Sequence, residues 1–241
     1  MTPRIELLFE DADLVIANKP SGMLTIPDRH DASLPSLHRL LQAQLGVELW
    51  IVHRLDRDTS GVVCFAKNEE SHRHVSILFQ NHDVTKLYAG LVHGHVQPQS
   101  GRIEAAIAPN PAQPGKMMVS RSGKMAVTDY QVSEQWPLYA LLQLQIHTGR
   151  THQIRVHMRH LGHSIVGDKL YGDGKPLLLS SFKKKFNLST KDEEERPLVN
   201  RLALHAYQLS FKKPDGTTVT AEAPLPKDMA VAVKQLQKWS N

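Results

Sequence analysis

The chain has 241 residues, 41% of them hydrophobic, which excludes a largely disordered protein and allows one large domain or two small ones. Its formal net charge of +5 favours a polyanionic partner such as RNA, although many cytosolic proteins are mildly basic. The single cysteine, Cys64, excludes an internal disulfide and indicates a reducing cytoplasm, and no apolar segment is long enough for an export signal or a membrane span.

The N-terminal part of the chain alternates short apolar segments with polar turns. Residues 10–13 form a polar turn of hairpin length between two apolar runs. Farther on, leucines recur on one stripe of a segment that ends in Gly46, which predicts an amphipathic helix packed on a sheet. Asn68 is suited to cap the start of a second helix. The pattern predicts strands at 5–9, 14–17, 50–52 and 61–66 and helices at 33–46 and 68–80.

The rest of the chain is richer in strands. Pro214 and Gly216 preset a turn between two strand-like runs, so we expect a hairpin near the C-terminus. A closing helix over 227–239 places Met229, Val233 and Leu236 on one face. Further strands are predicted at 84–92, 102–107, 126–132, 138–146, 202–211 and 217–221. This mixture of helices and strands predicts an α+β fold.

The domain organisation is expected to be simple, because the sequence contains no internal repeat and no low-complexity linker. We expect a single domain over residues 1–241 with an exposed, charged and mobile insertion at 173–200. The insertion carries the run Lys183-Lys184-Lys185, which we interpret as solvated surface rather than a specific site.

Three segments carry candidate chemistry. The first is His53-Arg54-Leu55-Asp56-Arg57-Asp58-Thr59-Ser60-Gly61, in which Asp56 lies between cationic groups just before a strand-like run and is a candidate catalyst. The second, residues 86–94, places Tyr88, Gly90 and Val92 on one face of a strand, where Gly90 leaves room beside the ring for a flat molecule. On its own, a tyrosine in this position is more often a packing residue.

The third segment, residues 148–159, combines a predicted helix start with basic side chains. Thr151 can cap this helix, whose first amide groups favour an anion. His152, Arg155 and Arg159 fall on a basic stripe beside an apolar one. A solvated basic face is the simpler interpretation of this segment when it is considered alone.

All three segments resemble signatures of the RluA family of RNA pseudouridine synthases. They match its His-Arg-Leu-Asp and Thr-Ser-Gly elements, its Lys-x-Tyr motif and its Thr-Gly-Arg-x-His-Gln-Ile-Arg motif. Fainter landmarks follow in family order at residues 14–22, 162–172 and 201–206, with Ser164 where the family more usually has proline. Because the resemblance begins almost at Met1, we expect a short form without the N-terminal RNA-binding domain of many relatives.

The resemblance implies a pseudouridine synthase catalytic fold, with a mixed, mostly antiparallel sheet, flanking helices and a central RNA-binding cleft. It implies site-specific isomerisation of uridine to pseudouridine in structured ribosomal RNA or tRNA, without cofactor or metal. We expect a cytoplasmic monomer without an obligate protein partner. Asp56 would be the essential aspartate, and Tyr88 would stack on the base and accept its C5 proton. Arg54 would enter the space left by the flipped base or hold a phosphate. Further RNA contacts would come from His53, Arg150 and His152.

Arg155 has a separate role in the resembling family, where its counterpart pairs with the catalytic aspartate. Desolvation in a site that encloses a base would raise the pKa of Asp56 unless an opposite charge lay within about 4 to 6 Å. A guanidinium suits this task because it binds a carboxylate in two places and keeps its proton. Whether Asp56 acts as a nucleophile at C1′ or as an acid/base stays open.

Two other classes of protein would also account for parts of this sequence. A non-catalytic RNA-binding module explains the basic charge but not the joint presence of Asp56, Tyr88 and Arg155. A metal-dependent hydrolase is suggested by the 14 histidines, but none of them stands in a His-Glu-x-x-His pattern or a comparable set of ligands.

Overall fold

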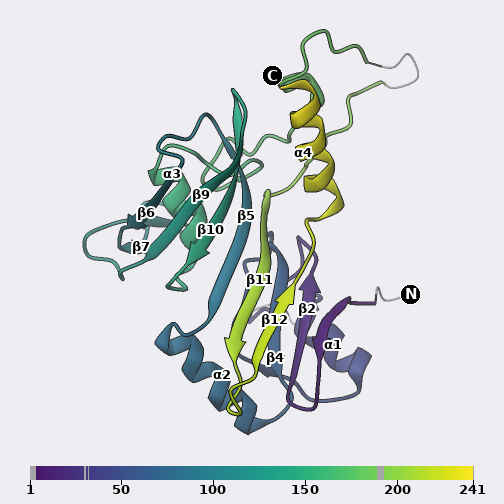
Figure 1. Cartoon of the computed structure of the whole chain (residues 1–241), viewed down its shortest axis with the longest axis vertical. Coiled ribbons are helices and arrows are strands. Elements are labelled where there is room, and N and C mark those ends of the chain that lie inside the picture. The colour runs from purple at the N-terminus through teal and green to yellow at the C-terminus, as the bar shows by residue number, and fades with distance from the viewer. Residues whose placement is uncertain (1–3, 30, 32, 189–192, 241) are drawn as a thin grey trace. The chain divides into compact units, whose positions relative to one another are not determined.

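The computed structural model describes residues 4–29, 31, 33–188 and 193–240 (Figure 1). Its contacts divide the chain into two compact units. The first unit comprises the described residues of Met1–Leu87 and His205–Pro224, and the second comprises those of Tyr88–Leu204 and Leu225–Asn241. A single domain over 1–241 stays a prediction.

The first unit contains strands from both ends of the chain and two helices. Its strands are β1 (Leu7–Glu10), β2 (Leu14–Lys19), β3 (Trp50–Ile51), β4 (Ser60–Ala66), β11 (Leu204–Lys212) and β12 (Thr218–Glu222), and its helices are α1 (Leu37–Leu45) and α2 (Glu69–Asn81). The strand order is β1-β2-β4-β11, with β12 paired to β11 and β3 paired to β4. Only the pair of β4 and β11 is parallel among the pairs with a described register in this unit.

Close backbone contact joins β4 to β11. A Cβ on Gly61 would lie 2.0 Å from the Ala206 carbonyl oxygen, and its φ of +116° is a conformation that favours glycine. Glycine is therefore required directly after the candidate catalytic loop. Apolar side chains from both ends of the chain, including Leu14, Val62 and Leu209, form a buried core in this unit.

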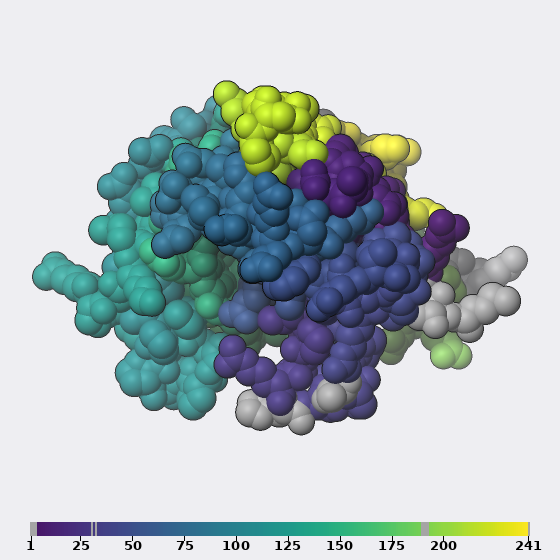
Figure 2. Space-filling view, turned by 90° about the horizontal axis from the view of Figure 1, so that it is seen from below, coloured from purple at the N-terminus to yellow at the C-terminus, as the bar shows by residue number. Residues whose placement is uncertain are grey.

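Both predicted helices of the first unit are present. Helix α2 starts where expected, since the Asn68 side chain accepts a hydrogen bond from the Ser71 amide. Helix α1 begins at Leu37 rather than residue 33, because Ser36 is extended and caps it. The His74 ring donates from Nε2 to the Lys212 carbonyl, 3.0 Å away. Figure 2 shows the neighbouring turn, in yellow-green, beside α2, in blue.

The second unit is built on antiparallel strands. It contains most of β5 (Thr85–His93), then β6 (Ser100–Glu104), β7 (Ile107–Pro109), β8 (Met117–Val119), β9 (Val127–Gln135) and β10 (Tyr139–Ile146). Strand order is β5-β10-β9-β6, and β7 and β8 form a separate pair. The predicted strand at 102–107 is therefore two short strands, β6 and β7, and β8 was not predicted.

Helices α3 (Gln153–His160) and α4 (Lys227–Trp239) and the short 3-10 helix η1 (Leu179–Ser181) complete the second unit. Figure 1 shows α3 beside the strands, and the buried His157 bonds to Thr128 of β9 at 2.9 Å. The bounds predicted for the closing helix are confirmed by α4. The elements together form the α+β mixture with mostly antiparallel strands that the sequence predicts.

The insertion at 173–200 is only partly exposed, which corrects the expectation. Leu177 and Val199 are buried and pair with each other, and Phe182 is also buried. These apolar side chains anchor both ends of the segment, while Lys184 and Lys185 are exposed as expected. Residues 189–192 of the insertion lie outside the described residues.

Candidate active site

Asp56 lies half-buried on an irregular loop that enters β4. The residue before it is held from both sides by one buried side chain. The Thr25 hydroxyl donates to the Leu55 carbonyl at 2.9 Å and accepts from the Leu55 amide at 3.1 Å. Because both backbone groups of Leu55 are bound, the position from which Asp56 projects is closely defined.

The buried ammonium of Lys19 holds the other side of the loop. Its Nζ donates to the carbonyls of Arg57 at 2.9 Å, Met23 at 2.8 Å and Pro20 at 3.0 Å. The side chain has no exposed surface, so these bonds replace the water that a charged group requires. Lys19 thus ties the residue after Asp56 to the end of β2.

Further bonds extend the contact between residues 19–25 and the loop. The Gly22 amide donates to the Arg57 carbonyl at 2.9 Å, and Arg57 Nε donates to the Gly22 carbonyl at 3.0 Å. The Ser21 hydroxyl donates to the Asp58 carbonyl at 2.6 Å. Segment 14–22, a faint landmark in the sequence, therefore acts as a clamp on the Asp56 loop.

His53 has contacts that fix the start of the loop. Its ring stacks on Phe79 at 4.5 Å between centroids, and its Nε2 accepts the Cys64 amide at 2.9 Å. Burial, with a smaller contribution from the charge of Lys86, lowers the pKa of His53 to about 3. The ring is therefore neutral near pH 7 and adds no positive charge for a phosphate. Its role in RNA binding stays a prediction, as does that of the exposed Arg54.

On β5, Lys86 and Tyr88 alternate with more exposed neighbours, and both are buried. Burial lowers the pKa of Lys86 to about 8, and its Nζ lies 5.7 Å from the centre of the Phe79 ring. Lys86 belongs to the Lys-x-Tyr motif, but the sequence did not single it out. The period of two on β5, which puts Lys86 on the same face as Tyr88, is the signal that could have indicated its burial.

Gly90 does not leave open space for a flat molecule, which corrects the sequence-based interpretation. A Cβ at this position would lie 3.0 Å from Leu144 Cδ1, 3.3 Å from Ile165 Cδ1 and 3.6 Å from Leu204 Cδ1. Apolar side chains from other elements therefore fill the space, and Gly90 is a packing position.

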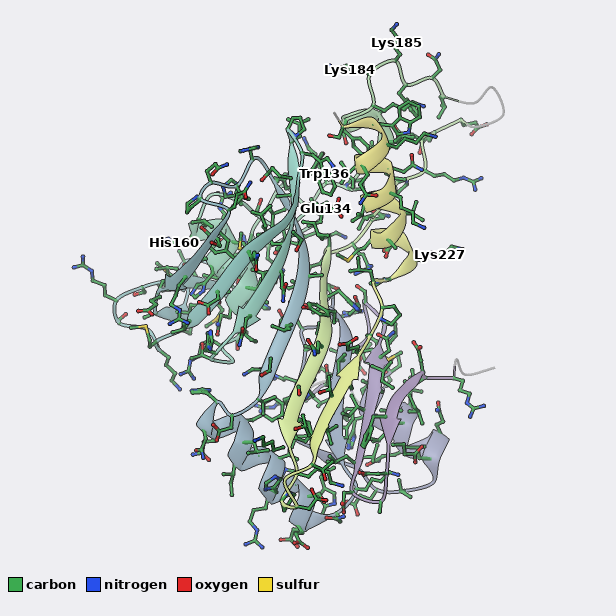
Figure 3. All side chains as sticks on the ribbon, viewed as in Figure 1. Glu134, Trp136, His160, Lys184, Lys185 and Lys227 are labelled. Carbon is green, nitrogen blue, oxygen red and sulfur yellow. The ribbon has the colours of Figure 1, made fainter. Side chains whose placement is uncertain are left out.

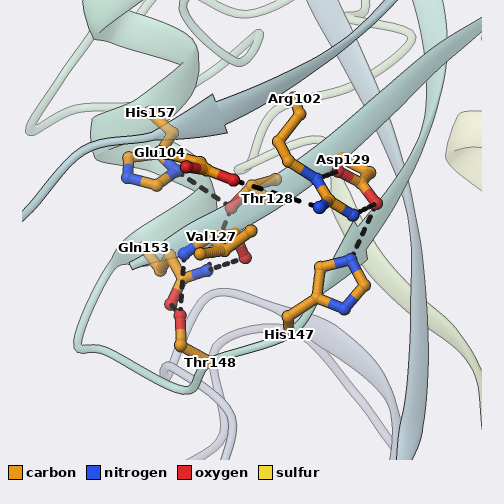
Figure 4. A network of polar contacts seen from close by, with 9 residues as sticks. All are labelled: Arg102, Glu104, Val127, Thr128, Asp129, His147, Thr148, Gln153 and His157. Atoms are coloured by element: carbon orange, nitrogen blue, oxygen red, sulfur yellow. Dashed lines mark hydrogen bonds and ion pairs between the residues drawn. The ribbon is translucent and has the colours of Figure 1, made fainter. Parts of the chain in front are cut away.

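The start of α3 is defined by the buried amide side chain of Gln153 (Figure 4). Its Oε1 accepts from the Thr148 hydroxyl at 2.7 Å and from the Arg150 amide at 3.0 Å. Its Nε2 donates to the Val127 carbonyl at 2.9 Å and to the Thr128 hydroxyl at 3.0 Å. All four hydrogen-bonding positions of the amide are used, so α3 is held to both β9 and the turn before it.

The predicted cap at Thr151 is wrong. The N-cap of α3 is His152, in the left-handed region at φ +56°, and no side chain caps the helix. The Gln153 amide side chain instead binds the preceding turn. The predicted basic stripe is also wrong in part, because Arg155 is buried whereas Arg159 is exposed.

Arg155 is held by Asp168 and Tyr171, which follow α3 in the chain. Its Nε donates to Asp168 Oδ2 and its Nη2 to Asp168 Oδ1, both at 2.8 Å. The Tyr171 ring covers the guanidinium, with Cζ 5.0 Å from the ring centre. Both charged side chains are almost fully buried, so the bidentate pair compensates two charges removed from water.

Asp168 is held in turn by its own loop. Burial alone would raise the pKa of its carboxyl group, but the bonds and charge of Arg155 and the amides of Leu170 and Tyr171 lower it below the usual value. The preceding Gly167 has φ +73°, and a Cβ there would lie 2.2 Å from the Arg201 carbonyl oxygen. The sequence does not single out Asp168 and Tyr171 as neighbours of Arg155, although both stand in the faint landmark at 162–172.

Two other predicted RNA contacts lie at the start of α3. The Tyr171 hydroxyl accepts the Met117 amide at 2.8 Å and lies 2.8 Å from His152 Nδ1, to which it can donate its proton. Arg150 Nε donates to the Met125 carbonyl at 3.0 Å. The structure thus brings Arg150, His152 and Arg155 together at one helix start.

The predicted residues fall into three groups. His53, Arg54 and Asp56 share one loop of the first unit. Residues Arg150, His152 and Arg155 share the start of α3 in the second unit, and Tyr88 lies on β5. Pairing of Asp56 with Arg155 stays a prediction. Among the described residues, no group of three or more His, Cys, Asp or Glu side chains is placed to hold a metal ion, and no helix is long and apolar enough to cross a membrane.

Comparison with known proteins identifies the family. The family described as RNA pseudouridylate synthase matches residues 13–160, which include the Asp56 loop, the Lys-x-Tyr motif and α3. The chain belongs to the RluA family of RNA pseudouridine synthases. It is accordingly an isomerase that converts uridine to pseudouridine in RNA, and a non-catalytic RNA-binding module is not favoured.

Similar proteins carry the same description. An uncharacterised RNA pseudouridine synthase of Bacillus subtilis, YlyB, is 34% identical over 97% of this chain and 73% of the relative. The ribosomal large subunit pseudouridine synthase D of Haemophilus ducreyi is 32% identical over 97% of this chain and 71% of the relative. The solved structure of human RNA pseudouridylate synthase domain containing 4 is 28% identical, with a TM-score of 0.72, and the match covers 96% of this chain and 93% of that one.

Proposed function

We propose that this synthase modifies a specific uridine in structured RNA of the large ribosomal subunit. Two relatives, which are 32% and 35% identical to this chain and are named ribosomal large subunit pseudouridine synthase D, support this choice of substrate. A tRNA stem-loop is the alternative substrate. We further propose a cytoplasmic, monomeric enzyme that needs no protein partner.

Asp56 is the proposed catalytic residue. The observation that carries this assignment is the double clamp on its loop, in which Thr25 binds Leu55 and Lys19 binds Arg57. A reacting carboxylate must be held in a productive geometry, and backbone bonds on both sides of it provide such support. In the reaction, the N1–C1′ bond breaks and a C5–C1′ bond forms, while C5 loses a proton and N1 gains one. Asp56 assists at C1′ as nucleophile or as acid/base.

Arg54 and Tyr88 are proposed to act on the base itself. The target uridine must leave its stack, which costs a few kcal/mol, and the exposed Arg54 beside Asp56 is suited to occupy the vacated space. Tyr88 is proposed to stack on the base and accept the C5 proton. His53, Arg150 and His152 are proposed as further contacts to the RNA.

Arg155 is proposed to keep Asp56 ionised. The bidentate bond to Asp168 fixes the plane of the guanidinium, and Tyr171 covers one face of it. Through this arrangement, Asp168 acts as a positioning residue, because it orients Arg155 and does not itself touch the substrate.

The test has two parts. Pseudouridines are first mapped in ribosomal RNA and tRNA from cells with and without this protein. Loss of one modified position in large-subunit RNA supports the proposed substrate, whereas loss confined to tRNA overturns it. Purified enzyme and its Asp56→Asn variant are then compared on that RNA. We expect near-complete loss of product with RNA binding retained, and wild-type conversion by the variant would refute the role of Asp56.

A further inference from the structure

The solvent side of α4 carries a stripe of lysines. Lys227, Val231, Lys234 and Lys238 follow each other at intervals of three or four residues, so they lie on one face of the helix. All four are exposed. The buried residues of α4 lie on the opposite face and are Met229, Ala232, Val233 and Leu236.

Acidic groups do not neutralise this stripe within the helix. The only carboxylate of α4 is Asp228, which accepts bonds from Arg201 Nε at 2.7 Å and Nη2 at 2.8 Å. Beside the stripe, the Gln237 amide donates to the Glu134 carboxylate of β9 at 2.8 Å, which leaves one negative charge at the edge of the face. Within α4, the three lysines therefore outnumber the single carboxylate, which is already paired with Arg201.

A second group of lysines extends the stripe at the C-terminal end of α4. Lys183 of the insertion places its Nζ 4.3 Å from the centre of the Trp239 ring, and Lys238 approaches the same ring at 4.9 Å. Figure 3 shows the neighbouring Lys184 and Lys185 beyond this end of the helix and Lys227 at its start, directed away from the strands. The exposed indole thus joins the two groups of lysines.

We propose that this basic face of α4, made of Lys227, Lys234, Lys238 and the run Lys183–Lys185, binds the phosphate backbone of the substrate RNA away from the target uridine. The proposal rests on the proposed function, which supplies the RNA. Its basis is charge complementarity, because a regularly spaced line of ammonium groups, on a helix whose single carboxylate is paired with Arg201, matches a polyanion. The 13 residues of α4 span about 20 Å, which is enough for several phosphates along a strand.

The decisive variant is Lys227→Gln/Lys234→Gln/Lys238→Gln, which removes three charges from exposed helix positions. A matched control, Arg4→Gln/Arg73→Gln/Lys212→Gln, removes three charges from exposed positions of the first unit. A rescue variant replaces the three α4 lysines by arginine, which retains the charge. Binding of a transcript of the substrate RNA is measured over a range of salt concentrations, together with turnover at saturating RNA.

For the glutamine variant, we expect binding about tenfold weaker at moderate salt and a salt slope reduced by about 2, since each phosphate contact contributes about 0.7 to 0.9. The control and the arginine variant should bind like the wild type, and kcat should be unchanged in all of them. Equal binding by wild type and glutamine variant would overturn the proposal. An equal loss of RNA binding in the control variant would also overturn it. The same holds if these lysines are needed for binding to anionic lipid vesicles but not for binding to RNA.

Failure of this proposal is distinguishable from failure of the proposed function. If wild-type enzyme forms no pseudouridine in ribosomal RNA or tRNA, the function is wrong whatever α4 binds. If wild type and the glutamine variant form it with the same kcat/KM and bind RNA equally, only the role of α4 is wrong.

Discussion

Arg155 and Asp168 form a buried ion pair with two parallel hydrogen bonds of 2.8 Å each. The pair joins the helix α3 to the loop that follows it, and the Tyr171 ring closes one side of the guanidinium. A motif arginine that the sequence predicts as a partner of Asp56, the proposed catalytic residue, is thus held in place by a carboxylate from a different segment.

Substitution Asp168→Asn should destabilise the fold strongly. It would leave the buried Arg155 charge without its carboxylate, which costs on the order of 3 to 5 kcal/mol. Denaturant unfolding at neutral pH measures the loss, and Asp173→Asn, at a more exposed position, is the control. Stability within about 1 kcal/mol of the wild type would contradict the structural importance of the pair.

Arg155→Lys tests the geometry of the same pair separately from its charge. Lysine keeps a positive charge but cannot form the two parallel bonds to Asp168 or present a plane to Tyr171. We expect a smaller loss of stability than for Arg155→Ala and a kcat lowered by at least about tenfold, equivalent to about 1.4 kcal/mol in the barrier. Single-turnover kinetics at saturating RNA measures the rate of the chemical step. A variant with the wild-type kcat would show that Arg155 has no role in the active site.

Thr25→Val should loosen the loop that carries Asp56. The change keeps the shape of the side chain but removes both bonds to Leu55, which costs about 1 to 3 kcal/mol because buried backbone groups lose their partner. We expect kcat to fall more than RNA affinity. The exposed Thr218→Val serves as control and should leave both unchanged. A Thr25 variant with normal kcat would show that the clamp has no catalytic importance.

Lys86 makes stability depend on pH in a defined direction. Burial lowers its pKa from 10.5 to about 8, so between these values the unfolded chain binds a proton that the folded chain has lost. The contribution of this group to stability therefore rises with pH across that window, and the penalty of about 3 kcal/mol is fully present below pH 8.

Lys86→Met removes this penalty. At pH 7 the variant should be more stable than the wild type, and the advantage should shrink as the pH approaches 10.5. Unfolding measured at both ends of the window checks this, and an advantage that does not change with pH would exclude a buried, titrating Lys86.

Tyr88→Phe tests the proposed proton acceptor. The variant keeps the buried aromatic ring at this position of β5 but lacks the hydroxyl group. We expect it to bind RNA normally and to release no pseudouridine, as measured by conversion of the substrate RNA over time. Normal turnover would refute the assignment.

Local patterns in the sequence were sufficient for much of the architecture. The periodicity of residues 227–239 predicts α4 with its observed bounds, and Asn68 predicts the start of α2. Motifs around Asp56, Tyr88 and Arg155 also identified the family, because each motif combines particular residue types with a particular spacing. These features depend on neighbours along the chain, which is why a single sequence reveals them.

The tertiary structure decided which side chains surround those residues. Gly90 borders Leu144, Ile165 and Leu204 rather than open space, and Lys19 supports the Asp56 loop from the end of β2. Asp168 reaches Arg155 because Gly167 allows a backbone turn that other residues would block. The sequence by itself determined the family and most elements from local spacing and side-chain type. Burial and long-range hydrogen bonds depend on how distant segments pack, so only the tertiary structure decided how the candidate catalytic residues are held.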